Sequence, residues 1–301
     1  MSYPLLKQGD RLPSVGVVQK LLNSWNGKAQ KVDGVFGRKT TKEIIKFQKL
    51  RKINPSGQID ELTWKRLAEG RPNLKVIDCI DVFDPDAYLL EVRDIRTAGG
   101  KPILVPGMSG GLEKAIAEII AYAGKGKTFL LRFHGHGNGG LASMGSGAQF
   151  STQSTSLIGD PVDGVHGSDI DNGEEISPGK TFWRSTGEKV VIPAIRTNPL
   201  LFRYFQRLSI IFGVYGCIEF MHCNVCEGTD GRKLVSNVSR VARVPASGSP
   251  DLQFGGGLST FRLEGRTYTH FPNKQNLRSW CRSRIDFPKN RQSPLRRKWE
   301  K

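Results

Sequence analysis

The chain lacks an apolar run long enough to cross a membrane, and it lacks a basic segment followed by an apolar one near its start. A membrane-spanning helix needs roughly 18 or more consecutive apolar residues, so no membrane span is predicted. A secretory signal needs both the basic and the apolar segment. We therefore expect no signal peptide, and a protein that is cytoplasmic or is exported by a non-classical route.

Cysteine and histidine are both scarce, with five residues of each type among 301. An odd number of cysteines, three of them clustered, does not fit a disulfide framework. Reduced thiols, or one working thiol, fit this pattern better. The clustered cysteines are Cys217, Cys223 and Cys226.

Acidic residues are outnumbered, because 28 Asp and Glu stand against 45 Lys and Arg and leave a formal net charge of +17. The excess lies at the two ends, since residues 1–70 carry a net charge of +8 and residues 278–301 carry +7. Such a charge favours anionic partners. The sequence shows no base-reading motif and no platform of aromatic and basic residues, so no specific nucleic-acid partner is predicted.

The first 70 residues show helical spacing of apolar residues, interrupted by two turns that contain glycine. One turn lies at 32–37 and is followed by a helix over 38–51; the other lies at 56–60 and is followed by a last helix. The two turn-and-helix units form a weak internal repeat. We predict a small all-α three-helix bundle. Its apolar positions include Val15, Val18, Leu21, Leu22, Ile44, Ile45, Leu62 and Leu67.

A set of turn and helix residues in this region carries a family motif. The set is Asp33, Gly34, Phe36, Gly37, Thr40, Phe47, Gln48, Gly57 and Trp64. It resembles the peptidoglycan-binding domain found on many bacterial wall hydrolases. The resemblance implies a bacterial protein whose partner is peptidoglycan, and an anionic wall polymer suits the basic charge. We expect the aromatic residues of the motif to belong to the core.

After a linker at 71–73, the pattern changes to strands that alternate with helices up to residue 281. This alternation predicts crossover units and a mostly parallel sheet covered on both faces. An insertion at 138–189, rich in Gly, Ser, Thr and Asp, interrupts the order, and residues 282–301 form a basic C-terminal tail. The expected strands are 74–81, 102–106, 128–133, 218–222, 243–247 and 260–263, and the expected helices are 85–94, 110–124, 197–208 and 230–242.

Two of these strands end in residues suited to covalent chemistry. One runs into a His-Gly-His-Gly segment that contains His134 and His136, and the other runs into Cys223, with Cys226 close behind. Ligands gather at the carboxyl ends of parallel strands. A thiolate at such an end can attack a carbonyl while an imidazole manages the proton.

The segment Gly135-His136-Gly137, followed later by a strand-end cysteine, resembles the caspase-like cysteine peptidases, which include the bacterial CHAT-type domains. The resemblance covers about 74–281 and implies a caspase-like α/β domain that cleaves a protein or peptide substrate without a cofactor. It makes His136 the general base and Cys223 the nucleophile, with His134 and Cys226 as alternates. Asp251 is a candidate for the specificity pocket and would favour basic side chains.

Two other interpretations stay open. Cys223 and Cys226, with His222 or Cys217 and a strand-end histidine, could form a tetrahedral zinc site. A second Cys-x-x-Cys pair is missing, so we predict no metal. Alternatively, the second domain keeps its fold without turnover, and the whole chain is a non-catalytic wall-binding or scaffolding protein.

Overall fold

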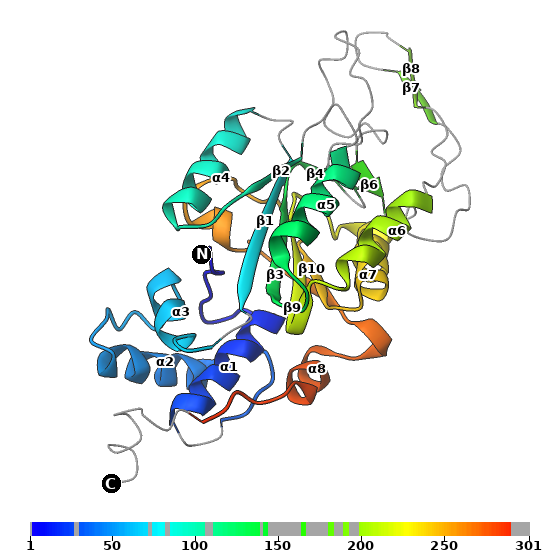
Figure 1. The fold of residues 1–301 in the computed structure, drawn as a ribbon. Coiled ribbons are helices and arrows are strands. Elements are labelled where there is room, and N and C mark those ends of the chain that lie inside the picture. Colours follow the sequence, from blue (N-terminus) through cyan, green and yellow to red (C-terminus); the bar gives the residue numbers. More distant parts are fainter. Residues whose placement is uncertain are drawn as a thin grey trace.

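The computed structural model describes residues 2–26, 30–71, 74–81, 85–105, 111–138, 141–143, 164–166, 180–183, 189–192 and 199–289. Figure 1 shows a central sheet with helices on both sides and a helical module, residues 2–71, packed at its lower end. Among the described helices, none combines the length and the apolar character needed to cross a membrane.

The helical module contains three helices, as the periodicity predicts: α1 (Pro13–Asn26), α2 (Arg38–Leu50) and α3 (Glu61–Leu67). The amphipathic α2 turns Ile44 and Phe47 inward and its charged side chains outward. In contrast, α1 is buried all round from residue 13 to residue 22. A helix that is buried on every side must be covered by more than its own bundle.

The second region contains a six-stranded sheet in the order β11-β10-β9-β3-β1-β2. Its strands run parallel except for β11, at one edge. This confirms the prediction of an α/β region with a mostly parallel sheet. The strands are β1 (Lys75–Asp81), β2 (Ile103–Val105), β3 (Thr128–His134), β9 (Phe212–Met221), β10 (Ala246–Gly248) and β11 (Tyr268–His270).

The helices of this region are distributed unevenly over the two faces of the sheet. One face is covered by α5 (Gly111–Ala123), α6 (Pro199–Leu208) and α7 (Gly228–Ala242), which share a core with the inward side chains of β1, β3 and β9. On the other face α4 (Pro85–Thr97) packs on Ile80 of β1. Crossover helices therefore leave the second face of β3 and β9 uncovered.

The helical module covers that face. Trp64 of α3 lies 5.5 Å from the ring of Phe129 in β3 and stacks on Tyr3 at 5.2 Å, measured between ring centroids. Its Nε1 donates a hydrogen bond of 2.6 Å to the carbonyl oxygen of Pro4. One continuous apolar core holds the three module helices together with Leu130, Cys217 and Met221 of the sheet. The linker predicted at 71–73, of which 72 and 73 lie outside the described residues, thus joins two parts that share a core.

A short helix near the C-terminus, α8 (Leu277–Ser283), closes the other side of α1. Gly16 permits this close approach, because a Cβ atom there would collide with the Sγ atom of Cys281. Lys20 of α1 pairs with Asp286 at 2.5 Å. The boundary predicted after residue 281 falls inside α8, and the described part of the basic tail packs on the module.

The prediction of a strand at 260–263 is wrong. A 3₁₀ helix, η2 (Gly257–Phe261), occupies this place. Gly256 and Gly257 have φ values of 88° and 62°, which break an extended chain. The Oδ2 atom of Asp94 then accepts hydrogen bonds from the Gly257 N–H and the Thr260 hydroxyl, which fixes the turn. A second 3₁₀ helix, η3 (Pro272–Lys274), precedes α8.

Most of the predicted insertion at 138–189 lies outside the described residues. The described parts near it form short strands. These are β4 (Gly137–Asn138), β5 (Leu141–Ser143), β6 (Gly164–His166), β7 (Lys180–Trp183) and β8 (Lys189–Ile192).

Candidate functional site

The segments that contain His136 and Cys223 leave the carboxyl ends of the neighbouring strands β3 and β9. His134 pairs with Met221 in the parallel register, so His136 and Cys223 each follow two residues later. A Cβ atom added at Gly137 would lie 2.5 Å from the carbonyl oxygen of Cys223, so the two strand exits touch. The order of strands reverses between β1 and β3, so the switch point at which ligands bind in open α/β sheets lies one strand away from the β3–β9 pair, at the same edge of the sheet.

Cys223 differs from the other four cysteines because its side chain is partly exposed while theirs are buried. Its Sγ atom lies 3.3 Å from both the backbone nitrogen and the carbonyl oxygen of Gln253. The chain turns sharply just after it, with Asn224 at a φ of 52°. The alternate Cys226 lies in the core, and burial raises the pKa of its thiol to about 12. Of the two cysteines, Cys223 is better placed to meet a substrate.

The alternate histidine, His134, belongs to a buried charge cluster on the module side of the sheet, which we define as Asp78, Glu91, Arg132, His134 and Glu219. Arg132 Nε donates a 2.6 Å hydrogen bond to Asp78, and the ring of His134 lies 3.2 Å from Asp78 and 3.3 Å from Glu91. Ser2 reaches into the cluster and contacts Asp78 and Arg132. These contacts leave His134 enclosed.

The electrostatics of the cluster follow from its burial and its partners. Burial alone would lower the pKa of His134, but Glu91 and Asp78 raise it to about 9. Burial alone would raise the pKa of Asp78, but Arg132 and His134 hold it well below its usual value. Burial raises the pKa of Glu219 to about 7 against the opposing effect of Arg132. A histidine that is cationic at neutral pH cannot serve as a general base, which favours His136 for that role.

The raised pKa of His134 predicts a loss of stability at alkaline pH. The contribution of a group with a raised pKa is complete below its unfolded value of 6.5 and disappears as the pH rises through about 9. We expect urea unfolding to show a loss of about 2–3 kcal/mol between these pH values. The loss should shrink in His134→Gln and persist in the control His270→Gln. An unchanged alkaline loss in His134→Gln would show that other groups cause it.

The two motif turns of the module are built alike, each around a buried glutamine. Gln19 Oε1 accepts hydrogen bonds from the backbone N–H groups of Asp33 and Gly34, both at 2.9 Å. Gln48 Oε1 accepts one from the Gly57 N–H, also at 2.9 Å. Both glycines have a φ of 73°. This equivalence strengthens the internal repeat, and the motif residues Phe36, Thr40, Phe47, Gln48 and Trp64 are all buried.

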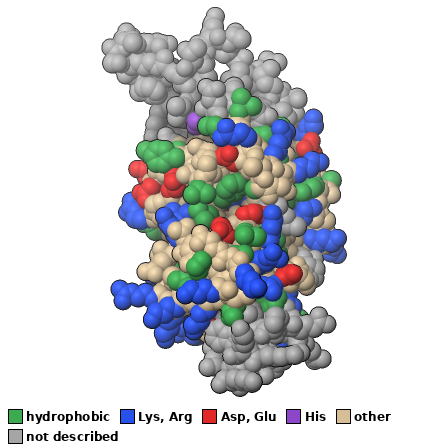
Figure 2. Space-filling model, turned by 90° about the vertical axis from the view of Figure 1, so that its left-hand side faces the viewer, with side chains coloured by type: hydrophobic (Ala, Val, Ile, Leu, Met, Phe, Trp, Pro, Cys, Tyr) green, Lys and Arg blue, Asp and Glu red, His purple; other side chains and the backbone are tan. Residues whose placement is uncertain are grey.

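The exposed surface of the module is strongly basic. Because the sheet and α8 enclose α1, the outward face of α2 is the main helical surface open to a polymer. Figure 2 shows Lys and Arg side chains gathered at the lower left of the molecule, where the module lies, and further ones higher on the same face. The exposed basic residues of α2 are Arg38, Lys39, Lys42, Lys46 and Lys49.

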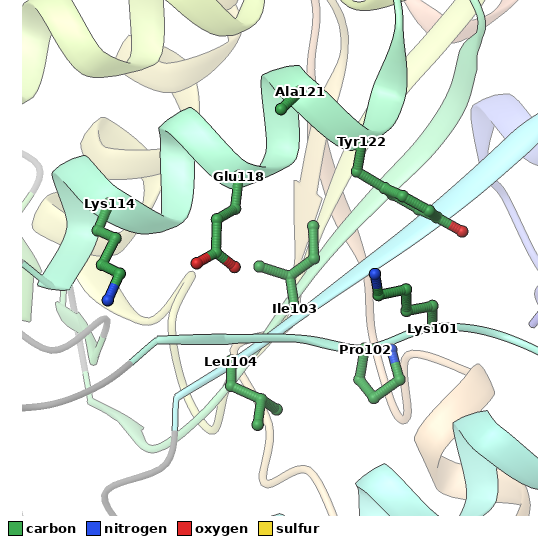
Figure 3. A pocket seen from close by; sticks show the side chains of 8 residues that line it. All are labelled: Lys101, Pro102, Ile103, Leu104, Lys114, Glu118, Ala121 and Tyr122. Atoms are coloured by element: carbon green, nitrogen blue, oxygen red, sulfur yellow. The ribbon is translucent and has the colours of Figure 1, made fainter.

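A groove of about 610 Å³ lies away from this site, between the edge strand β2 and α5 (Figure 3). Lys101 and Lys114 lie toward its two ends, with Glu118 between them on α5. Neither His136 nor Cys223 lines the groove. Within the part of the chain that the structure describes, no group of three His, Cys, Asp or Glu side chains is arranged to hold a metal ion.

Two features, the charge cluster and the buried Gln19, are marked in the sequence outside the family motifs. The charge cluster places Asp78, Arg132 and Glu219 in one row across β1, β3 and β9. Each of these charged residues has an apolar residue on both sides in its strand, which is a readable sign of a buried polar network. The role of Gln19 could have been inferred from the repeat that relates it to Gln48.

Comparison with known proteins agrees with the N-terminal motif. Residues 11–67 match the family model of peptidoglycan binding domains. A curated relative, an uncharacterized protein in the bpoA1 3′ region of Kitasatospora aureofaciens, is 39% identical over 67 residues. That match covers 22% of this chain and 57% of the relative, so the chain spans little more than half of the relative's length. No solved structure matches the chain.

Proposed function

We propose that the chain binds peptidoglycan through its helical module and cleaves peptide bonds with Cys223 and His136 in a caspase-like α/β domain. The family match at 11–67 carries the first half of the proposal. The second half is supported by the adjacent exits of β3 and β9, where the partly exposed thiol follows the strand next to His136. The substrate would be a protein held near the wall or a peptide cross-link of the wall.

The proposed chemistry uses one thiol and one imidazole. His136 accepts the proton of the Cys223 thiol, and the resulting thiolate attacks the carbonyl carbon of the scissile bond. The protonated imidazole then gives its proton to the leaving amine, and an acyl-enzyme forms. Water, deprotonated by His136, hydrolyses the thioester, so that the free acid leaves and the thiol is restored.

Wall binding can be tested by cosedimentation of the full chain with purified sacculi. We use the full chain because the module shares its core with the sheet. Binding through the module should persist at high salt and on sacculi stripped of anionic polymers, since salt screens purely electrostatic contacts. Soluble muropeptides should compete. Binding that vanishes on stripped sacculi would assign the interaction to anionic polymers and contradict recognition of peptidoglycan itself.

The nucleophile can be tested with an acyloxymethyl ketone probe that alkylates active cysteine peptidases. We expect the probe to label the wild type, to spare Cys223→Ala completely and to label Cys226→Ala normally. His136→Ala should slow labelling more than it slows alkylation by iodoacetamide, because both reactions use the thiolate but the probe must also bind in the substrate site beside the dyad. If labelling is lost in Cys226→Ala alone, the nucleophile is Cys226. If the wild type is not labelled, the proposal that the chain is a cysteine peptidase is wrong.

One observation favours the non-catalytic alternative. The Cys223 sulfur lies at hydrogen-bond distance from two backbone atoms of Gln253, as in a structural thiol that fastens a loop to the end of a strand. Under this alternative, Cys223→Ala would lower stability and leave every activity assay unchanged. The probe experiment separates the two functions.

A further inference from the structure

An exposed apolar surface lies beside the proposed nucleophile. We call it the apolar shelf and define it by five side chains that are 40% to 70% exposed: Leu89, Leu90, Leu252, Phe254 and Leu258. Leu252 and Phe254 flank Gln253, whose backbone contacts the Cys223 sulfur. A Cβ atom at Gly256 would lie 3.4 Å from Leu90, so the loop that carries Leu252, Phe254 and Leu258 packs against α4. Contiguous apolar patches on a protein surface are often functional.

Three carboxylates near the shelf, among the residues that the structure describes, are already paired within the protein. Asp94 accepts hydrogen bonds from Gly257 and Thr260, and Glu264 accepts them from the Phe254 N–H and the Ser259 hydroxyl. Asp251 pairs with Arg266 at 3.1 Å and accepts the Arg266 backbone N–H. These pairings argue against Asp251 as a pocket for basic side chains and leave the apolar groups as the recognition surface.

The backbone of Gln253 suits an extended peptide. Its N–H and its carbonyl oxygen both point at the Cys223 sulfur. If the thiol turns away to react, one donor and one acceptor become available to a neighbouring main chain. An extended chain that paired there would place its side chains near Leu252 and Phe254, because main-chain pairing aligns side chains at a fixed spacing.

From these contacts we infer that the apolar shelf binds a peptide with bulky apolar side chains next to the bond that Cys223 attacks. This inference rests on the proposed peptidase function and names its substrate class. Aliphatic and aromatic residues of the peptide would cover Phe254 and Leu258, and no charged residue would be required at these positions.

The test uses full-length Cys223→Ala, which binds without cleaving, and two fluorescein-labelled ten-residue peptides. The peptides differ only in a central Leu-Phe-Leu or Ser-Asp-Ser. We expect fluorescence anisotropy to show that the apolar peptide binds at least tenfold more tightly. Adding Phe254→Ser and Leu258→Ser should weaken binding of the apolar peptide at least tenfold, because two large apolar side chains no longer cover it. Leu62→Ser, which removes an apolar side chain 46% exposed on α3, is the matched control.

The outcomes separate the inference from the function on which it rests. If both peptides bind equally well and the ketone probe still labels Cys223 in the wild type, the inference that the apolar shelf binds the peptide is wrong, and the peptidase proposal is unaffected. Selective binding without probe labelling would overturn the peptidase. Phosphatidylcholine vesicles carry no net charge. If they bind the wild type and do not bind the variant with Phe254→Ser and Leu258→Ser, the shelf binds a membrane and the peptide proposal is wrong.

Discussion

Replacing Arg132 with methionine should lower the free energy of unfolding by about 3–5 kcal/mol, because it removes the closest cation from the buried carboxylate of Asp78 and leaves only His134 to balance it. Arg132 and Asp78 are both fully buried and lie 2.6 Å apart. Arg132 also contacts the Ser2 carbonyl and stands between Asp78 and Glu219 in the sheet. Since a domain is stable by only about 5–15 kcal/mol, urea denaturation should show a large shift of the midpoint.

Two controls show whether the lost stability comes from the unpaired charge. The double variant Asp78→Leu/Arg132→Met removes both charges and should recover much of the loss, because apolar replacement of a whole buried pair is often neutral. Arg266→Met breaks a solvent-exposed pair with Asp251 and should leave stability nearly unchanged. A double variant as unstable as Arg132→Met would indicate that the shape of the guanidinium, rather than its charge, is what the site requires.

Local structure could be predicted from the sequence because its signals are local. The helix expected at 38–51 is found at Arg38–Leu50, and the strand expected at 128–133 is found at Thr128–His134. Apolar periodicity reports burial within one element, which is enough to find that element. The parallel sheet followed from strands that alternate with helices.

Contacts between distant elements could not be predicted in the same way. The helix α8 carries four polar or basic residues around Trp280 and Cys281, so it has little apolar periodicity. Its packing on Gly16 cannot be read from either segment alone. The edge strand β11 is only three residues long. However, α1 did give a sign. Gly16 and Val17 are small or apolar, like the core positions predicted beside them, so no polar face is visible in this part of α1. A helix without a polar face is enclosed on all sides.

The candidate site also has parts that the sequence predicts and parts that depend on contacts between distant elements. The glycines at each strand exit are local signals, and the order of histidine before cysteine can be read directly from the chain. His136 and Cys223 could therefore be proposed from the sequence. The choice between His134 and His136 depends on Asp78 and Glu91, which come from other elements. The choice between Cys223 and Cys226 depends on Gly248, whose position in β10 encloses the second thiol. Both choices need the fold.

Deleting residues 1–71 should prevent the rest of the chain from folding cooperatively. The deletion would expose apolar side chains of the sheet side, among them Val76, Phe129, Leu130 and Met221. At about 1.5–3 kcal/mol for each large apolar side chain, the loss is roughly 10 kcal/mol, as large as the stability of a whole domain. It would also remove Ser2 from the charge cluster. We expect residues 74–301 alone to bind a hydrophobic dye and to lack a sharp thermal transition.

Proteolysis provides the control for this deletion, because it cuts the chain without removing any contact. A specific protease site placed at 72–73 should allow cleavage of the folded protein into two fragments that still elute together and unfold in one transition. Adding residues 1–71 to residues 74–301 during refolding should restore that complex. Fragments that separate after cleavage and each keep a native circular dichroism spectrum would contradict the shared core. The module would then be a tethered domain that binds the wall independently of the sheet.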